Sequence, residues 1–104
     1  MAIRDTNRIL AEIAAERDRQ VSAHGYDDSH DDRHTKSEIA IAAACFALST
    51  ADAHERPSIP AAIALLWPWQ DYVCGRRPAR RALIIAAAML IAEIERLDRA
   101  TGRG

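Results

Sequence analysis

Apolar residues recur at helical spacing in the first quarter of the chain. They fall on one face of a helix and are Ile9, Leu10, Ile13, Ala14 and Val21. We expect this helix to begin near Thr6 or Asn7, either of which can cap it, and to run to about Ala23 before Gly25 ends it. The opposite face carries charged residues that can form ion pairs along the helix, namely Arg8, Glu12, Glu16 and Arg19.

The next segment, residues 25–34, contains one aromatic and no aliphatic side chain, so we expect a loop outside the core. Thr35 and Glu38 then match a capping box at the start of a second helix. That helix should run from Lys36 to about Ala53. Because residues 39–48 are apolar on all sides, it should lie at the centre of the fold.

Residues 54–78 interrupt the helical pattern. Ser58 is placed to cap a short helical turn over residues 59–66. Pro68 disfavours helix at the residue before it, so Trp67 and Trp69 should lie on an ordered, extended corner.

A long third helix is predicted from Pro78 to about Ala100, with Gly102 beyond it as the stop. The chain therefore reads as one all-α domain over residues 1–104, with three main helices and a short helical turn. The composition agrees with this, because 22 of the 104 residues are alanine and only five are aromatic. Alanine is the best helix former and a poor strand former, which excludes an all-β fold.

The net charge of −1 conceals an asymmetry along the chain. Residues 1–38 carry −3, residues 39–71 carry −2 and residues 72–104 carry +4. An acidic N-terminal part and a basic C-terminal part favour self-association or the binding of an anionic ligand. The basic segment is too small to indicate binding of a nucleic acid polymer. Helices two and three are apolar over more surface than three helices can hide, so we expect a homo-oligomer formed through alanine-rich faces.

Neither a disulfide scaffold nor a membrane span is expected. The two cysteines, Cys45 and Cys74, are too few for such a scaffold, and Cys45 falls within an apolar run typical of a core. The N-terminal segment lacks the apolar region of a signal peptide, so we expect a cytoplasmic protein. The longest apolar run, residues 82–92, would span about 16 Å as a helix, roughly half of a bilayer core.

Two groups of residues could bind a metal ion. The first is rich in ligand types and comprises His30, Asp31, Asp32 and His34. The capping box argues against this group, because it leaves both histidines in the loop. The second group consists of carboxylates on the predicted helices, namely Glu12, Glu16, Glu38, Glu93, Glu95 and Asp98. Carboxylates that converge inside a bundle can hold Mg²⁺ over a substrate phosphate.

Glu95 and Asp98 are three residues apart, and in this they resemble half of the metal site of the all-α NTP pyrophosphohydrolases. The similarity is loose, since Glu12 and Glu16 are spaced by four where that family uses three. It implies a Mg²⁺-dependent nucleotide pyrophosphohydrolase as an alternative function. Ordinary ion pairs on a solvated face, such as Glu95 with Arg99, are the simpler interpretation of these carboxylates.

The start of the third helix is rich in arginine. Cys74 and Arg80 match the Cys-five-residue-Arg spacing of cysteine phosphatases, but no strand is predicted before Cys74, as that loop requires. An anion site suits the segment better, because free helix amides would be joined by Arg76, Arg77, Arg80 and Arg81. Solvated arginines, or pairing with the acidic 27–32 loop, remain the alternatives.

Four of the five aromatic residues fall outside the apolar helices: Tyr26, Trp67, Trp69 and Tyr72. This placement favours stacking against a base, although the tryptophans could equally cover the end of a small bundle.

Four ordered motifs together resemble a group of small phage and prophage proteins. They are Glu16-Arg17-x-Arg19-Gln20, Gly25-Tyr26 with His30-Asp31-Asp32-x-His34, Trp67-Pro68-Trp69, and the segment from Ala92 to Arg99. The resemblance covers most of the chain and implies an accessory protein of a bacterial virus, without implying a reaction.

In that context we expect non-catalytic binding of a nucleotide-like anionic ligand, such as a second messenger of bacterial immunity, with no cofactor. Arg76, Arg77, Arg80 and Arg81 would bind phosphate. Tyr26, Trp67 and Trp69 would stack on bases, and Arg17 or Gln20 would give polar contacts. The pyrophosphohydrolase, with Mg²⁺, and a structural or host-protein-binding module are the alternatives.

Overall fold

The computed structural model describes residues 3–70 and 77–102. Within these ranges the chain is all-α and contains no strand, which confirms the expected fold class. Its helices are α1 (Ile3–His24), α2 (Asp28–Asp32), α3 (Glu38–Leu48), α4 (Ser58–Leu66) and α5 (Ala79–Ala100). In the described part of the chain, no helix combines the length and the apolar character that crossing a membrane requires.

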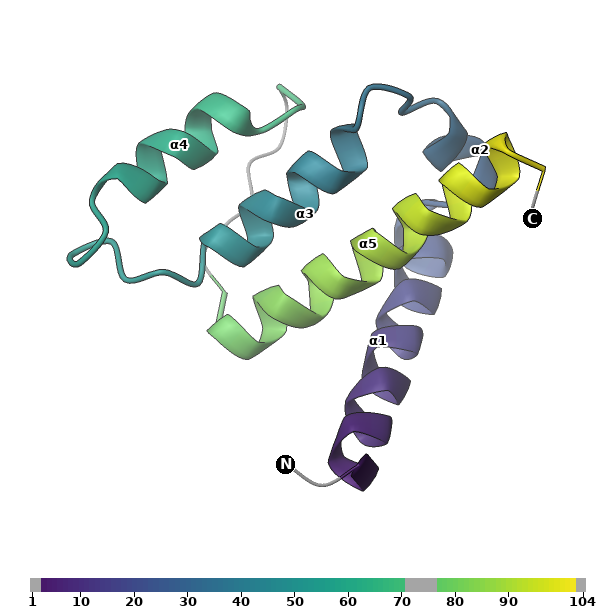
Figure 1. Cartoon of the computed structure of the whole chain (residues 1–104), viewed down its shortest axis with the longest axis horizontal. Helices are drawn as coiled ribbons and strands as arrows, with labels where there is room; N and C mark the ends of the chain where they lie inside the picture. The colour runs from purple at the N-terminus through teal and green to yellow at the C-terminus, as the bar shows by residue number, and fades with distance from the viewer. Residues whose placement is uncertain (1–2, 71–76, 103–104) are drawn as a thin grey trace.

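α3 occupies the centre of one layer, with α5 along one side and α4 along the other (Figure 1). Alanines at this contact, Ala42 and Ala43 on α3 and Ala86 on α5, are almost fully buried and allow the two backbones to approach closely. Phe46, Ile63 and Trp67 complete the core cluster. The alanine-rich faces are therefore used within one chain.

α1 crosses α5 on its other side and contacts it differently (Figure 1). Its fully buried residues, among those whose side chains are described, are all polar: Glu16, Arg17 and Gln20. Ion pairs, more than apolar packing, therefore hold α1 in place. α1 ends as predicted at Gly25, whose φ of 69° is in the left-handed region that glycine tolerates.

The polar segment after α1 differs from the prediction of a loop outside the core. Residues 28–32 form α2, capped by Asp27, whose carboxylate accepts a hydrogen bond of 3.0 Å from the His30 amide. Asp31 is only 2% exposed. A charge can be buried here because Arg17 of α1 pairs with it, a long-range contact that local polarity does not reveal.

The predicted capping box is wrong. α3 begins two residues late, at Glu38, and its N-cap is Ser37, which has a φ of 64° and makes no side-chain cap. In a capping box the Glu38 carboxylate would accept a hydrogen bond from the Thr35 amide. It accepts one of 2.5 Å from the Lys36 amide instead. α3 also stops at Leu48, because the Ser49 and Thr50 hydroxyls bond to carbonyls of the last turn.

Trp67 adopts the extended backbone expected before a proline, with a ψ of 123°. This corner turns the chain away from α4 and places Trp67 against Phe46, with ring centroids 5.9 Å apart. Trp67 is thus a core residue, and Trp69 is half-buried beside it.

Candidate functional site

A cavity of about 680 Å³ lies between the second half of α1, the α2 segment, α5 and the 67–69 corner. Its volume is within the range of small-molecule sites in proteins. The base of the cavity is apolar and is formed by Ile39 of α3 and by Ile85, Met89 and Ala92 of α5.

Aromatic and imidazole rings form a continuous row along this cavity. Neighbouring ring centroids are between 4.6 and 5.9 Å apart, and the row runs through His24, Tyr26, His30, His34, Trp69, Trp67 and Phe46. The members come from the end of α1, from α2 and the segments on either side of it, from α3 and from the tryptophan corner. Such a wall offers flat, polarizable surface on which a planar ligand can stack.

Arg17 joins the polar side of the cavity to three other parts of the chain. Its guanidinium donates hydrogen bonds to the Asp31 carboxylate at 3.0 Å, to the Tyr26 carbonyl at 3.0 Å and to Glu95 on α5 at 3.2 Å. Asp31 is fixed from the other side by His30, whose Nδ1 lies 2.9 Å from Oδ1. Arg17 therefore fixes the backbone that carries Tyr26 and His30 into the row of rings.

Glu16 is the second buried charge of this wall, at 3% exposed. It accepts two hydrogen bonds of 2.9 Å from Arg19 and one of 2.6 Å from Arg81. Burial raises the pKa of the Glu16 carboxyl, but the hydrogen bonds from Arg19 and Arg81 outweigh it, and the net pKa is lower than usual. Glu16 is therefore an ionised anchor between α1 and α5.

Gln20 lies one turn further along α1, is 4% exposed and lines the cavity. Its Nε2 donates to Glu16 at 3.3 Å. The Gln20 side-chain oxygen accepts no hydrogen bond from the described residues. An amide oxygen that lines a cavity in this way can accept a hydrogen bond from a ligand.

Two further arginines, Arg33 and Arg77, line the cavity and are exposed and half-buried, respectively. Arg33 lines it, and its guanidinium forms no ion pair or hydrogen bond with any residue that the structure describes. Arg77 lies over the Phe46 ring, with its Cζ 5.3 Å from the ring centroid. Both positions suit the charged end of a ligand whose flat part meets the rings.

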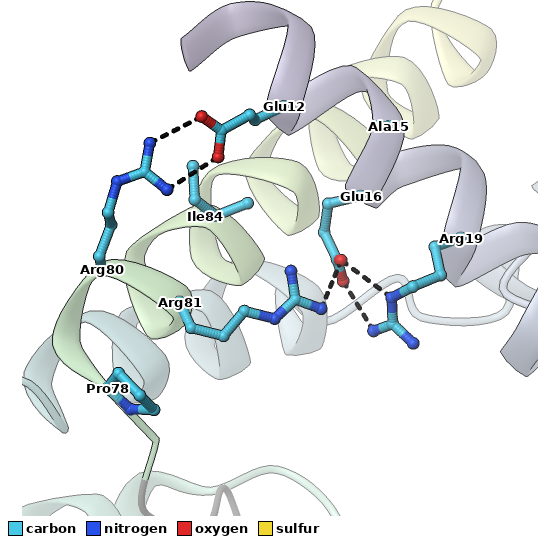
Figure 2. A pocket seen from close by; sticks show the side chains of 8 residues that line it. All are labelled: Glu12, Ala15, Glu16, Arg19, Pro78, Arg80, Arg81 and Ile84. Carbon is cyan, nitrogen blue, oxygen red and sulfur yellow. Dashed lines mark hydrogen bonds and ion pairs between the residues drawn. The ribbon is translucent and has the colours of Figure 1, made fainter.

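The arginines at the start of α5 lie elsewhere. Arg80 makes two hydrogen bonds, of 2.7 and 2.8 Å, to Glu12, and Arg81 binds Glu16 (Figure 2). They border a separate hollow of about 480 Å³ with Pro78 and Ile84. Hydrogen bonding to Arg80 lowers the pKa of Glu12, as expected for a carboxylate in a formed ion pair. Arg76, Cys74 and Tyr72 lie outside the described residues.

The carboxylates of the pyrophosphohydrolase alternative do not converge. Glu12 pairs with Arg80, Glu16 with Arg19 and Arg81, and Glu93 with Arg96. Glu95 pairs with Arg17, while Glu38 lies 3.4 Å from His34. Asp98 forms no ion pair with a described residue. Arginines thus take most of the oxygens that Mg²⁺ would need.

The four metal candidates of the polar segment also do not converge on a common point. Asp31 faces Arg17, Asp32 binds Arg99 at 2.8 Å, and His34 approaches Glu38. His30 and His34 contact each other as rings, edge to face. Over residues 3–70 and 77–102, no three His, Cys, Asp or Glu side chains are placed to hold a metal ion.

Six of the nine residues proposed as ligand-binding line the large cavity: Arg17, Gln20, Tyr26, Trp67, Trp69 and Arg77. Arg80 and Arg81 do not. Sequence reasoning missed Arg33, His24 and Phe46, and it assigned His30 and His34 only to a metal. The ERxRQ and HDDxH motifs did contain a usable pattern, because the structure brings those two segments together through Arg17 and Asp31.

No family model matches the chain, and neither a curated protein nor a solved structure is significantly similar to it.

Proposed function

We propose that this protein binds a nucleotide-like anionic small molecule in the cavity between α1, α2 and α5, without catalysis. The observation that supports the proposal is the union, in one cavity of about 680 Å³, of a continuous row of rings and a wall of buried polar side chains. A planar base with a charged tail needs both surfaces.

In this proposal the base stacks on the exposed part of the ring row. Tyr26 is 39% exposed and stacks on both His24 and His30, with ring planes inclined by 25° and 26°, so a base reaches its ring by taking the place of the exposed His24 imidazole. The Gln20 amide accepts a hydrogen bond from an exocyclic amino group of the base. Stacking on an aromatic side chain contributes about 1–3 kcal/mol per base.

Arg33 and Arg77 then bind the phosphate. Arg33 carries most of this role, since its guanidinium has no partner among the described residues. An arginine fork matches the geometry of phosphate oxygens. Arg80 and Arg81 could contribute only if their bonds to Glu12 and Glu16 opened, so the proposal does not depend on them.

Binding without turnover is favoured over hydrolysis because four of the six helical carboxylates are bonded to arginines and the six do not face a common point. The resemblance to small phage and prophage proteins supplies a context for such a binder. In a bacterial cytoplasm, it would sequester a nucleotide second messenger of immunity.

The test is isothermal titration of the folded protein with a panel of linear and cyclic nucleotides, each compared with its nucleoside. At least one nucleotide should bind, and more tightly than its nucleoside. Tyr26→Ala should weaken both ligands roughly ten-fold or more, since ten-fold corresponds to about 1.4 kcal/mol. Arg33→Gln should weaken only the nucleotide.

The matched control is Arg56→Gln, which removes the same charge from an exposed arginine outside the cavity. It should leave the affinity unchanged. If no nucleotide releases or absorbs heat, or if Arg33→Gln and Arg56→Gln behave alike, the proposed function is wrong. Either result would favour the alternative of a structural or host-protein-binding module.

A further inference from the structure

α5 carries an apolar stripe that no described residue covers. Leu83, Leu90, Ile94 and Leu97 are 48%, 47%, 57% and 48% exposed, and the half-buried Ala87 lies between the first two. Steps of four and three residues join these five positions, which is the spacing of a coiled-coil seam. We call them the α5 stripe.

The stripe faces away from the chain's own core. Ile85 and Ala86 of α5 belong to the core cluster with α3, and Arg81 on another side bonds to α1. The stripe is the remaining face of the helix. Four large aliphatic side chains, each about half exposed and aligned along about four turns, form a contiguous patch of the kind that marks an interaction surface.

We propose that the α5 stripe binds the same stripe of a second copy of this chain, with the two helices antiparallel and the two-fold axis at Leu90. The sizes of the side chains support this register. Leu90 then meets its counterpart, the small Ala87 lies opposite the large Ile94, and Leu83 lies opposite Leu97. The small-against-large pair of Ala87 and Ile94 lets the two helices approach closely at that step, between the leucine pairs.

The charges at the helix ends support the same orientation. Arg80 precedes the stripe by one turn. It bonds to Glu12 of its own chain, yet its side chain is 64% exposed, while the Asp98 carboxylate has no ion-pair partner among the described residues. Antiparallel pairing brings Arg80 of one copy toward Asp98 of the other. Parallel pairing would instead place Arg80 against Arg80, which is repulsive. It would also align the two helix dipoles in the same direction.

The first experiment is sedimentation equilibrium on the full chain, with and without the double substitution of Leu90→Lys and Ile94→Lys. The unmodified chain should sediment as a dimer, and the double variant as a monomer with its helical circular dichroism retained. Leu97→Lys, near the end of the helix where the folding risk is lower, should weaken dimerisation at least ten-fold.

The matched control is Leu65→Lys on α4, where the leucine is 85% exposed and off the stripe. It should leave the dimer intact. A chain that is monomeric at high micromolar concentration overturns the proposal. A dimer that Leu97→Lys and the double variant leave unchanged also overturns it, as does equal sensitivity to Leu65→Lys.

Disulfide trapping tests the orientation, in a Cys74→Ser background that leaves only the buried Cys45. Leu90→Cys should cross-link to itself under mild oxidation. Leu83→Cys should not, but it should cross-link when mixed with Leu97→Cys. Efficient self-linking of Leu83→Cys would exclude the antiparallel pairing.

Discussion

Glu16 is a buried carboxylate on which opposing influences act. Burial alone raises the pKa of Glu16, and the hydrogen bonds from Arg19 and Arg81 reverse that effect, so the folded pKa lies below the unfolded one. A carboxyl whose pKa is lowered by folding stabilises the native state above its unfolded pKa. That contribution is lost as the pH falls through the folded value.

We therefore expect the free energy of unfolding to decrease as the pH is lowered below about 4.5. Glu16→Gln should destabilise the protein at neutral pH by about 1–3 kcal/mol, because charge-assisted hydrogen bonds to Arg19 and Arg81 are weakened. It should also reduce the loss of stability in acid. Urea unfolding, followed by circular dichroism at neutral pH and at about pH 3.5, measures both effects.

Glu12→Gln is the matched control, since it is the same substitution one turn earlier on α1. The pKa of Glu12 is also lowered by its arginine, Arg80, but both side chains are well exposed. Exposed ion pairs contribute little, so the effect of Glu12→Gln should be clearly the smaller. Equal effects of the two substitutions would show that the burial of Glu16 has no energetic consequence.

At the scale of elements, α2 is a helix of five residues that exists because of contacts made far along the chain. Asp31 pairs with Arg17 of α1, and Arg99 of α5 binds both Asp28 and Asp32. A helix this short is not stable by itself. Ion pairs to α1 and α5 must hold it in place, and through it the position of His30.

Asp31→Asn should consequently destabilise the protein by about 2–3 kcal/mol, because it leaves the charge of the buried Arg17 poorly compensated. Asp28→Asn, the same substitution in the same helix, should cost less than about 1 kcal/mol, since the Asp28 side chain is 71% exposed. Urea unfolding measures both values. Similar costs for the two variants would contradict the role given to the pair of Arg17 and Asp31.

The contrast between α1 and α2 shows how far local sequence pattern carries. Apolar periodicity and the terminal glycine predicted where α1 ends, because both act within a few residues. The sequence pattern did not predict α2, because α2 depends on the long-range pair of Asp31 with Arg17. It also placed the start of α3 too early, because the Glu38 carboxylate accepts its hydrogen bond from the Lys36 amide and not from the Thr35 amide. Local rules cannot rank such competing partners.

The candidate site divides in the same way. The aromatic residues outside the apolar helices led to the prediction that they stack on a base. Tyr26 and Trp69 do line the cavity, and the stacking itself stays a prediction. The role of the arginines at α5 was harder to foresee, because Arg80 and Arg81 meet acids of α1 that lie over sixty residues earlier. Which acids these arginines meet depends on how α1 and α5 cross, and that crossing cannot be deduced from the local sequence.

Across the whole molecule, two kinds of contact hold the helices together. α3 and α5 meet through buried alanines, Cys45 and Phe46, which is an apolar contact. α1 meets α5 through Glu12 with Arg80 and Glu16 with Arg81 (Figure 2), and also through Arg17 with Glu95. The first contact is insensitive to moderate salt, whereas the second is weakened by screening where solvent reaches it.

Hydrogen exchange can separate these two contacts. The Debye length falls from about 10 Å at 0.1 M salt to about 3 Å at 1 M, so the ion pairs at the exposed edge of the α1 contact weaken. Amides in the first half of α1 should therefore exchange several-fold faster in about 1 M sodium chloride than in about 0.1 M, while those of α3 stay unchanged. Arg80→Gln, which removes the most exposed of the three pairs, should reduce this salt response, and Arg56→Gln should not. Should α1 and α3 show one common opening energy at both salt concentrations, the helices unfold as a single unit, and the polar contact is as firm as the apolar one.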